Sequence, residues 1–283
     1  MAWTTLAVLD WTTQRFTEAG IAGARLEAQL LLAHVLGCSR VQLYTGFDKP
    51  LGEDELAAYR GLIKRRLGGE NVSYLLGEQE FWGLTLHVNE HVLVPRPDTE
   101  TLIEVARELR TDRAAPCRVL DLCTGSGAIA LALAKELPGA TVIATDVSIE
   151  AVAIAKKNAE RNALGDRVDV RAGDLFAPVA GERFDLIVSN PPYIASAVIA
   201  TLSAEVRREP KLALDGGPDG LAFYDRICGV AREYLVPGGA LVVEHGFDQA
   251  DTVRERFERA GFADIVLGHD LAKNPRITHG FAR

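Results

Sequence analysis

The sequence predicts an α/β protein with a doubly wound sheet, preceded by a small helical bundle. Three observations lead to this fold class. From Arg118 onward, short apolar runs typical of buried strands alternate with helical patterns, which favours parallel βαβ units. A glycine-rich loop at Gly125 and Gly127 separates the first strand from its helix. Residues 1–75 instead follow helical spacing of their apolar positions.

The spacing of apolar residues in the first 75 positions predicts short helices. These helices must pack against one another, because none can bury its apolar face alone. One helix covers Arg25–Gly37, with Gly37 as its C-cap, and another runs from Glu53 to Leu67 before Gly68-Gly69. We therefore assign residues 1–75 to a helical domain.

Residues 76–94 change to a strand pattern and predict a β-hairpin that links two domains. Apolar residues recur from Phe81 to Val88, Asn89-Glu90 supplies a turn, and Val92 and Val94 follow. The remainder, residues 95–283, forms the third part, a catalytic domain. It opens with a helix that has Pro97 in its first turn.

The elements of the third part follow in order along the chain. The predicted strands are Val119–Leu122, Thr141–Thr145, Val168–Val170, Phe184–Ser189 and Ala240–Val243, followed by an edge hairpin from Asp264–Leu267 and Arg276–Phe281. The predicted helices between them are Ala128–Leu137, Ile149–Asn162, Leu221–Leu235 and Ala250–Ala260.

Composition restricts the class of protein. With 283 residues, 48% of them hydrophobic and 25% charged, the chain suits one large or two modest globular domains. No apolar stretch approaches the roughly 20 residues that span a membrane, and Met1–Thr5 carries no signal-peptide core, so we expect a cytoplasmic protein without a membrane partner. Four scattered cysteines predict free thiols and no metal site.

The distribution of charge argues against a nucleic-acid partner. The formal net charge is −8, and residues 1–75 are balanced, so the whole excess of acid lies in residues 76–283. The one compact basic run is Lys64-Arg65-Arg66, which we expect on a solvated helix face.

The loop after the first predicted strand is a candidate cofactor site. Gly125, Gly127 and Ala130 fit the G-x-G-x-x-G/A pattern, whose glycines let the backbone approach a ligand at a helix N-terminus. Asp146 ends the second strand, about 20 residues on, where an acid binds ribose hydroxyls. These features predict a nucleotide cofactor, and alone they do not separate NAD from S-adenosylmethionine.

Two further features favour S-adenosylmethionine. Asp121 directly precedes the loop, where its carboxylate would repel a pyrophosphate but could accept hydrogen bonds from an ammonium group. The turn after the third strand offers the carboxylate of Asp174 to an adenine amino group and the apolar side chain of Leu175 to its ring. Core packing is an equally good explanation for Leu175 and Phe176.

Asn190-Pro191-Pro192-Tyr193 follows the strand Phe184–Ser189 and predicts a stiff loop, since prolines cannot continue a central strand. The loop presents an amide side chain, backbone carbonyls and an aromatic face, which together suit a planar NH2 group. The lone pair of such a nitrogen is delocalised. The Asn190 oxygen and the Pro191 carbonyl could accept its two N–H groups and fix it for methyl transfer, while Tyr193 packs against the flat acceptor. No general base is evident.

The chain resembles the release-factor glutamine N5-methyltransferases, the HemK/PrmC family, over nearly its full length. The motifs that carry the resemblance are Glu80–Leu84, Val94–Glu100, Asp121–Ala130, Asn190–Tyr193, Glu209–Leu214 and Glu244-His245-Gly246. The resemblance implies a class I S-adenosylmethionine-dependent methyltransferase domain with a Rossmann-like seven-stranded sheet. It also implies that the substrate is the glutamine of the Gly-Gly-Gln motif in class I peptide chain release factors.

Matched residue by residue, the resemblance implies cofactor contacts and a substrate clamp. The implied cofactor residues are Thr124, Gly125, Ser126, Gly127, Asp146 and Leu175, and the clamp is Asn190 to Tyr193. Cys123 departs from the family pattern, which has glycine there. From the size of cysteine we expect cofactor binding to survive and the backbone at Cys123 not to need an angle that only glycine adopts.

Other acceptors use similar loops. N6-adenine methyltransferases carry comparable tetrads but need a basic surface, which this acidic chain lacks. A sibling enzyme methylates a glutamine of a large-subunit ribosomal protein, and the stretch Pro95–Glu100 resembles the release-factor type better. A catalytically inactive binding module is a third alternative, against which the intact Asp146 and Asn190 argue. We expect a monomer.

Overall fold

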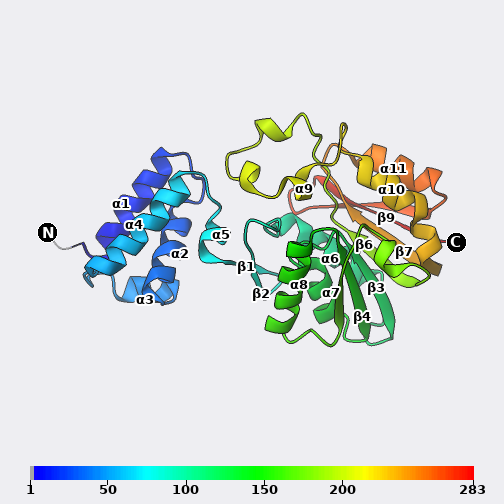
Figure 1. The fold of residues 1–283 in the computed structure, drawn as a ribbon, viewed down its shortest axis with the longest axis horizontal. Helices are drawn as coiled ribbons and strands as arrows, with labels where there is room; N and C mark the ends of the chain where they lie inside the picture. The colour runs from blue at the N-terminus through cyan, green and yellow to red at the C-terminus, as the bar shows by residue number, and fades with distance from the viewer. Residues whose placement is uncertain (1–2) are drawn as a thin grey trace. The chain divides into compact units, whose positions relative to one another are not determined.

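The computed structural model describes residues 3–283, which divide into two compact units (Figure 1). The smaller unit contains the described residues up to Gly77 together with Ser203–Arg208. The larger unit contains Glu78–Leu202 and Glu209–Arg283, so the hairpin that follows Gly77 belongs to it. None of the helices within residues 3–283 has the length and apolar character to cross a membrane.

The smaller unit is a helical bundle around an apolar core that includes Phe16, Leu31 and Leu32, each of them fully buried. Its helices are α1 Thr5–Glu18, α2 Ala24–Leu36, α3 Arg40–Thr45, α4 Glu53–Leu67 and α5 Val72–Leu76. Gly37 ends α2 in the left-handed conformation, with φ 59°, so the predicted C-cap is confirmed.

Arg66, near the end of α4, corrects the prediction of a solvated basic face. Its side chain is only 6% exposed, and its guanidinium binds the carboxylates of Glu27 on α2 and Glu205 from the segment Ser203–Arg208. The Arg66 Nη2 to Glu205 Oε2 distance is 2.9 Å. The run Lys64-Arg65-Arg66 therefore serves partly as internal structure, because α4 packs this position against α2.

The hairpin at the start of the larger unit turns earlier than the sequence pattern indicates. Its strands are β1 Glu78–Phe81 and β2 Leu84–His87, and they pair antiparallel. Trp82 and Gly83 form the turn with φ of 51° and 63°, whereas the predicted turn at Asn89-Glu90 lies beyond the second strand. Two residues with positive φ are typical of the tightest hairpin turns.

A seven-stranded sheet forms the centre of the larger unit, as the resemblance implies, in the order β5-β4-β3-β6-β7-β9-β8. The first five strands in this order are parallel, and β9 pairs antiparallel with both β7 and β8. The bounds are β3 Cys117–Leu122, β4 Ala140–Asp146, β5 Val168–Ala172, β6 Phe184–Ser189, β7 Leu235–Glu244, β8 Ala263–His269 and β9 Pro275–Phe281.

Helices cover both faces of the sheet, as expected of a doubly wound fold (Figure 1). They are α6 Glu100–Glu108 (after the 3₁₀ turn Pro97–Thr99), α7 Ala128–Glu136, α8 Ile149–Arg161, α10 Ala222–Ala231 and α11 Ala250–Arg259, while the short helix α9 Lys211–Leu214 lies in the connection between β6 and β7. The predicted helix Leu221–Leu235 is too long. The helix ends at Ala231, a 3₁₀ turn follows, and β7 starts at Leu235. The strand continues through Gly238-Gly239 because the pairing with β6 shifts register there, as in a bulge, and Gly238 adopts a φ of 79°.

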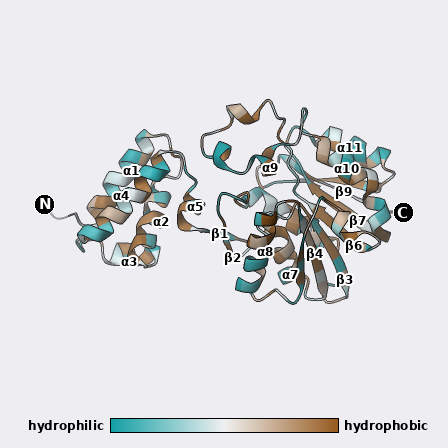
Figure 2. Ribbon diagram, in the orientation of Figure 1, coloured by the Kyte–Doolittle hydropathy of each residue, from teal (hydrophilic) through white to brown (hydrophobic). Residues whose placement is uncertain are grey.

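Alternate residues of the strands supply two apolar layers, one on each face of the sheet. Figure 2 accordingly colours much of the inner strands as hydrophobic. Val119 and Val142 pack with α6, α7 and α8 on one face, while Leu120 and Leu241 pack with α10 and α11 on the other. Because β3 lies between β4 and β6, the chain changes direction across the sheet at β3. Ligands of such sheets bind at the carboxyl ends of the strands beside this point.

Candidate functional site

The cofactor loop and the Asn-Pro-Pro-Tyr loop leave the sheet side by side. Leu122, the last residue of β3, pairs with Ser189, the last residue of β6, and the Ser189 hydroxyl donates to the Leu122 carbonyl at 2.9 Å. Cys123 and Asn190 are therefore the first residues beyond two neighbouring strand ends. This register brings the two sequence motifs to one place.

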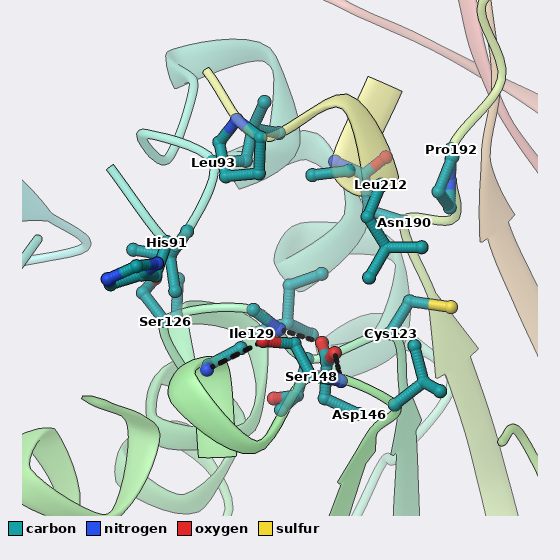
Figure 3. A pocket seen from close by; sticks show the side chains of 18 of the residues that line it. His91, Leu93, Cys123, Ser126, Ile129, Asp146, Ser148, Asn190, Pro192 and Leu212 are labelled. Carbon is teal, nitrogen blue, oxygen red and sulfur yellow. Dashed lines mark hydrogen bonds between the residues drawn. The ribbon is translucent and has the colours of Figure 1, made fainter. Parts of the chain in front are cut away.

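A cavity enclosing about 1120 Å³ of empty space, part of it open to solvent, lies over these strand ends. Nine of the predicted site residues line it: Cys123, Thr124, Gly125, Ser126, Asp146, Asp174, Leu175, Asn190 and Pro192. Figure 3 shows Asn190, Cys123 and Asp146 along one side of the cavity, with His91 and Leu93 across from them. Asp121, Gly127, Pro191 and Tyr193 are not in its wall.

Asp146 lies at the end of β4 with its carboxylate held by backbone N–H groups. Oδ2 accepts from Gly125 at 2.8 Å and Oδ1 accepts from Ser148 at 2.9 Å. Burial raises the pKa of Asp146, and the hydrogen bonds from Ser148 and Gly125 act in the opposite direction. Each oxygen keeps a lone pair for a further donor, so the carboxylate suits ribose hydroxyls.

Asp121 lies beneath the loop, fully buried at the end of β3. Its Oδ2 accepts from the Thr124 hydroxyl at 2.6 Å and from the Ala130 N–H at 3.2 Å, while Oδ1 has no partner among residues 3–283. Burial raises the pKa of Asp121 to about 7. An unpaired buried carboxylate oxygen is costly. Because Asp121 is not in the cavity wall, its contact with the ammonium group of a cofactor stays a prediction.

Cys123 has a backbone angle that favours glycine without requiring it. Its φ is 59°, in the left-handed region, which a residue with a Cβ adopts at a cost in free energy, so the expectation that no glycine-only angle is needed holds. The side chain lines the cavity and also packs against the apolar layer of α10 and α11. Cysteine therefore occupies a glycine-type conformation at the cofactor loop.

The turn after β5 places an apolar side chain and a carboxylate at the cavity. Leu175 is buried with φ 47°, and its carbonyl accepts from the Thr145 hydroxyl at 3.0 Å, which ties the turn to β4. Asp174 is exposed and forms an ion pair with Arg226. Leu175 belongs to the core and also lines the cavity, so core packing is confirmed, and its contact with an adenine ring stays a prediction.

Asn190 is positioned by a polar group that the sequence did not identify. Its Nδ2 donates to the Thr99 Oγ1 at 3.2 Å. Glu244 at the end of β7 lies beside Asn190, because β7 pairs with the strand that leads into it, and both Thr99 and Asn190 favour the ionised form of its carboxyl group. Burial raises the pKa of Glu244 to about 7, and Thr99 and Asn190 act in the opposite direction.

The rest of the tetrad forms the support of the site. Pro191 is buried, and Tyr193 packs against the layer of α10 and α11, where burial raises its pKa. The Tyr193 carbonyl accepts from Gln249 Nε2 at 3.0 Å. A Cβ on Gly220, whose φ is 78°, would lie 2.3 Å from the Tyr193 carbonyl oxygen, so this loop packs closely against a glycine.

Asn158 on α8 is another functional residue that the sequence did not reveal. It is fully buried, and its Nδ2 donates to the carbonyls of Ser126 at 2.8 Å and His87 at 3.0 Å, while its Oδ1 accepts from the His87 N–H at 2.6 Å. It thereby joins the cofactor loop to the hairpin. An asparagine within a helical pattern gives no local signal of these partners.

The residues present fit S-adenosylmethionine. Gly125 leaves open space where a side chain would stand, Asp146 offers acceptors to ribose hydroxyls, and Asp121 keeps an oxygen for a cation. No phosphate-binding cation is needed for such a ligand. A seven-stranded sheet of this order with this site defines a class I S-adenosylmethionine-dependent methyltransferase.

Comparisons with known proteins agree with this class. Residues 7–77 match the family model "PrmC N-terminal domain", and residues 98–210 match "Methyltransferase small domain". The chain is 50% identical to "Release factor glutamine methyltransferase" of Geobacter sulfurreducens over 98% of this chain and 96% of that protein. It is 48% identical to the protein of the same name of Bordetella pertussis, over 91% of this chain and 94% of that protein.

The chain belongs to the release factor glutamine methyltransferase family. Among solved structures, the Thermus thermophilus 16S rRNA N2 G1207 methyltransferase in complex with AdoMet and guanosine is similar in fold, with a TM-score of 0.54. The two are 21% identical, and the match covers 73% of this chain and 50% of that chain.

Proposed function

We propose that this protein transfers the methyl group of S-adenosylmethionine to the side-chain amide nitrogen of the glutamine in the Gly-Gly-Gln motif of class I release factors. The observation that carries the proposal is the register of β3 and β6. It places Asn190 beside the cofactor loop, at the wall of one shared cavity. Membership of the family supplies the acceptor.

The cofactor supplies an electrophilic methyl group when it is bound, and the residues of the chain hold the acceptor. The Nδ2 of Asn190 is bonded to Thr99, so its Oδ1 is the end left to accept an N–H of the glutamine amide. The Pro191 carbonyl is the second acceptor in this proposal, although Pro191 is not in the wall of the cavity in this structure. Held in this way, the nitrogen would keep its lone pair directed at the methyl group. The new N–C bond would form as the methyl–sulfur bond breaks, with S-adenosylhomocysteine as the leaving group, and the nitrogen would then release a proton to solvent.

The part of the cavity next to Asn190 supports a substrate with an aliphatic stem. The apolar residues of the cavity wall include Leu93, Pro192, Pro210, Leu212 and Phe223, and Figure 3 shows Leu212 and Pro192 on the side of Asn190. A glutamine side chain carries two methylene groups before its amide, so it can contact this apolar surface while its amide reaches Asn190. The acidic net charge of −8 disfavours nucleic acid in the same place.

One assay tests the acceptor. Purified protein is incubated with methyl-labelled S-adenosylmethionine and, separately, with a class I release factor, the same factor with its Gly-Gly-Gln glutamine changed to alanine, the large-subunit ribosomal protein, and DNA. We expect label on the first substrate alone. Label on the ribosomal protein or on DNA in place of the release factor would overturn the proposal.

Two variants test the roles of the residues. Asn190→Ala should lower kcat at least 100-fold while the dissociation constant of the cofactor, measured by calorimetry, stays within about threefold, because Asn190 holds the acceptor. Asp146→Ala should weaken cofactor binding by about 10-fold or more, since a charged acceptor of ribose hydroxyls is removed. Full activity of Asn190→Ala, or unchanged cofactor affinity of Asp146→Ala, would contradict these assignments.

The remaining parts of the proposal concern partners and place. We propose that the helical unit and the hairpin help to dock the release factor, with the protein acting as a monomer. A reaction on release factors belongs to translation termination and hence to the cytoplasm. Size-exclusion chromatography with light scattering, alone and with a release factor, checks the expected 1:1 stoichiometry.

A further inference from the structure

Glu244 is a buried carboxylate next to the acceptor site. Only 1% of its surface is exposed, and it lies at the carboxyl end of β7, next to the strand that leads into Asn190. The pairing of Val243 with Ser189 places it beside Asn190, and Thr99 and Asn190 both favour its ionised form, while its Oε2 has no hydrogen-bond partner among the described residues. It does not line the cavity.

The orientation of the Asn190 amide decides whether the clamp works. A carboxamide has an acceptor end and a donor end of nearly the same shape, and only the oxygen end can accept an N–H of the substrate. The Thr99 hydroxyl alone does not choose between the two ends, because it can donate or accept. An ionised carboxylate only accepts, so it attracts the NH2 end of Asn190 and the hydroxyl hydrogen of Thr99 together.

We propose that Glu244 is a positioning residue that, with Thr99, sets the orientation of the Asn190 amide so that its oxygen faces the acceptor nitrogen. This rests on the proposed methylation of glutamine at Asn190. Because Glu244 is outside the cavity wall, it acts through Asn190 and touches neither cofactor nor acceptor.

Charged and titratable groups surround Glu244 on several elements. Arg276 on β9 favours its ionised form, and Asp98 on the 3₁₀ turn before α6 disfavours it. The hydroxyls of Tyr193 and Tyr224 also face it, and Tyr224 donates to the Glu244 backbone carbonyl at 2.8 Å. Burial raises the pKa of Glu244 to about 7. Above that pH the carboxylate can only accept, so it enforces the orientation; the protonated carboxyl can also donate and therefore enforces it less.

The test compares Glu244→Gln with the wild type, using labelled S-adenosylmethionine and a release factor. Glutamine keeps the shape but can donate to the Asn190 oxygen, so both amide orientations become available. We expect kcat to fall about 10- to 100-fold, with the KM for the release factor and the cofactor dissociation constant within twofold. The kcat of the wild type should fall as pH decreases from 8 to 6, and the variant should lack the part of this fall that Glu244 causes.

Two further variants keep the proposal open to refutation. Thr99→Val removes the other partner of Asn190. In the double variant with Glu244→Gln, the fold-decrease in kcat should be smaller than the product of the two single fold-decreases, because both residues act on one amide. Thr278→Val is the matched control: it removes the hydroxyl bonded to His245 Nε2 at 3.0 Å, next to Glu244, without touching Asn190. It should lower the melting temperature and leave kcat near the wild-type value.

The outcomes separate the two levels of the hypothesis. A wild type that does not label release factor refutes the proposed function itself. With an active wild type, unchanged kcat in Glu244→Gln, multiplicative losses in the double variant, or a loss of kcat that appears only with a lowered melting temperature would each overturn the role of Glu244.

Discussion

The backbone angle φ of Cys123 lowers the stability of the folded protein at the cofactor loop. Left-handed φ costs a residue with a Cβ on the order of 1 to 2 kcal/mol, and glycine avoids this but gains freedom in the unfolded chain. With φ 59° at this position, Cys123→Gly should raise the free energy of unfolding by about 0.5 to 1 kcal/mol. Cofactor affinity should remain within twofold.

Ala163 provides the matched control for this prediction. It has φ 55°, is exposed, and follows α8 outside the cavity. Ala163→Gly should stabilise by a similar amount, whereas Cys123→Ala, which keeps the Cβ, should not stabilise. Chemical denaturation of the three variants measures the effect, and an unfolding free energy of Cys123→Gly below that of Cys123→Ala would contradict the argument.

At the scale of the elements, the loop after β6 depends on a glycine that belongs to another segment. A methyl group on Gly220 would overlap the Tyr193 carbonyl, and its φ of 78° adds strain. Gly220→Ala should therefore displace the tetrad, lowering kcat at least 10-fold and stability by about 1 to 3 kcal/mol. Gly229→Ala, with no atom near the new Cβ and a position within α10, should stabilise by up to about 1 kcal/mol and leave kcat unchanged. Steady-state kinetics and thermal melts would show the contrast, and equal behaviour of the two variants would refute it.

The elements differ in how far sequence predicts them. The strand Phe184–Ser189 was predicted with its observed bounds, because an apolar run ends at prolines that cannot continue it. The hairpin turn at Trp82-Gly83 was misplaced, since Trp82 in a left-handed conformation has no local signal in its residue type. Cofactor-loop residues and Asn190 could be proposed from their spacing along the chain. Asn158 was not singled out, and Glu244 was noted only as part of a motif without a role, because their partners are brought to them only by the pairing of strands and the packing of α8.

On the scale of the whole molecule, long-range ion pairs determine which segments fold together. Arg66 joins Glu27 and Glu205, and Arg208 donates to the Gly68 carbonyl at 2.7 Å, so Ser203–Arg208 belongs to the helical unit. Such partners, up to 140 positions apart, cannot be deduced from a periodic pattern.

Removing Arg66 should therefore destabilise the helical unit strongly. Arg66→Ala leaves two carboxylates without their buried partner, at a cost of about 3 to 5 kcal/mol. The neighbouring Arg65→Ala breaks an ion pair with Glu70 that is largely exposed on the arginine side, at a cost below about 1 kcal/mol. Hydrogen exchange measured by mass spectrometry should show faster exchange in α2, α4 and residues 203–208 for the first variant only. Equal protection in the two variants would count against the argument.

Two buried carboxyl groups should also make the stability of the molecule depend on pH. Burial raises the pKa of Asp121 and of Glu244 to about 7, above the values near 4 of unfolded chains. Between these values the folded state binds more protons than the unfolded state, so the free energy of unfolding decreases as pH rises from about 5 to 8. Asp121→Asn and Glu244→Gln should each remove part of this decrease. At about 1.4 kcal/mol per pKa unit, we expect each variant to gain on the order of 2 to 4 kcal/mol relative to the wild type at pH 8 and much less at pH 5. Urea unfolding at both pH values measures the difference, and a gain of the same size at pH 5 and pH 8 would show that these groups do not titrate as the structure indicates.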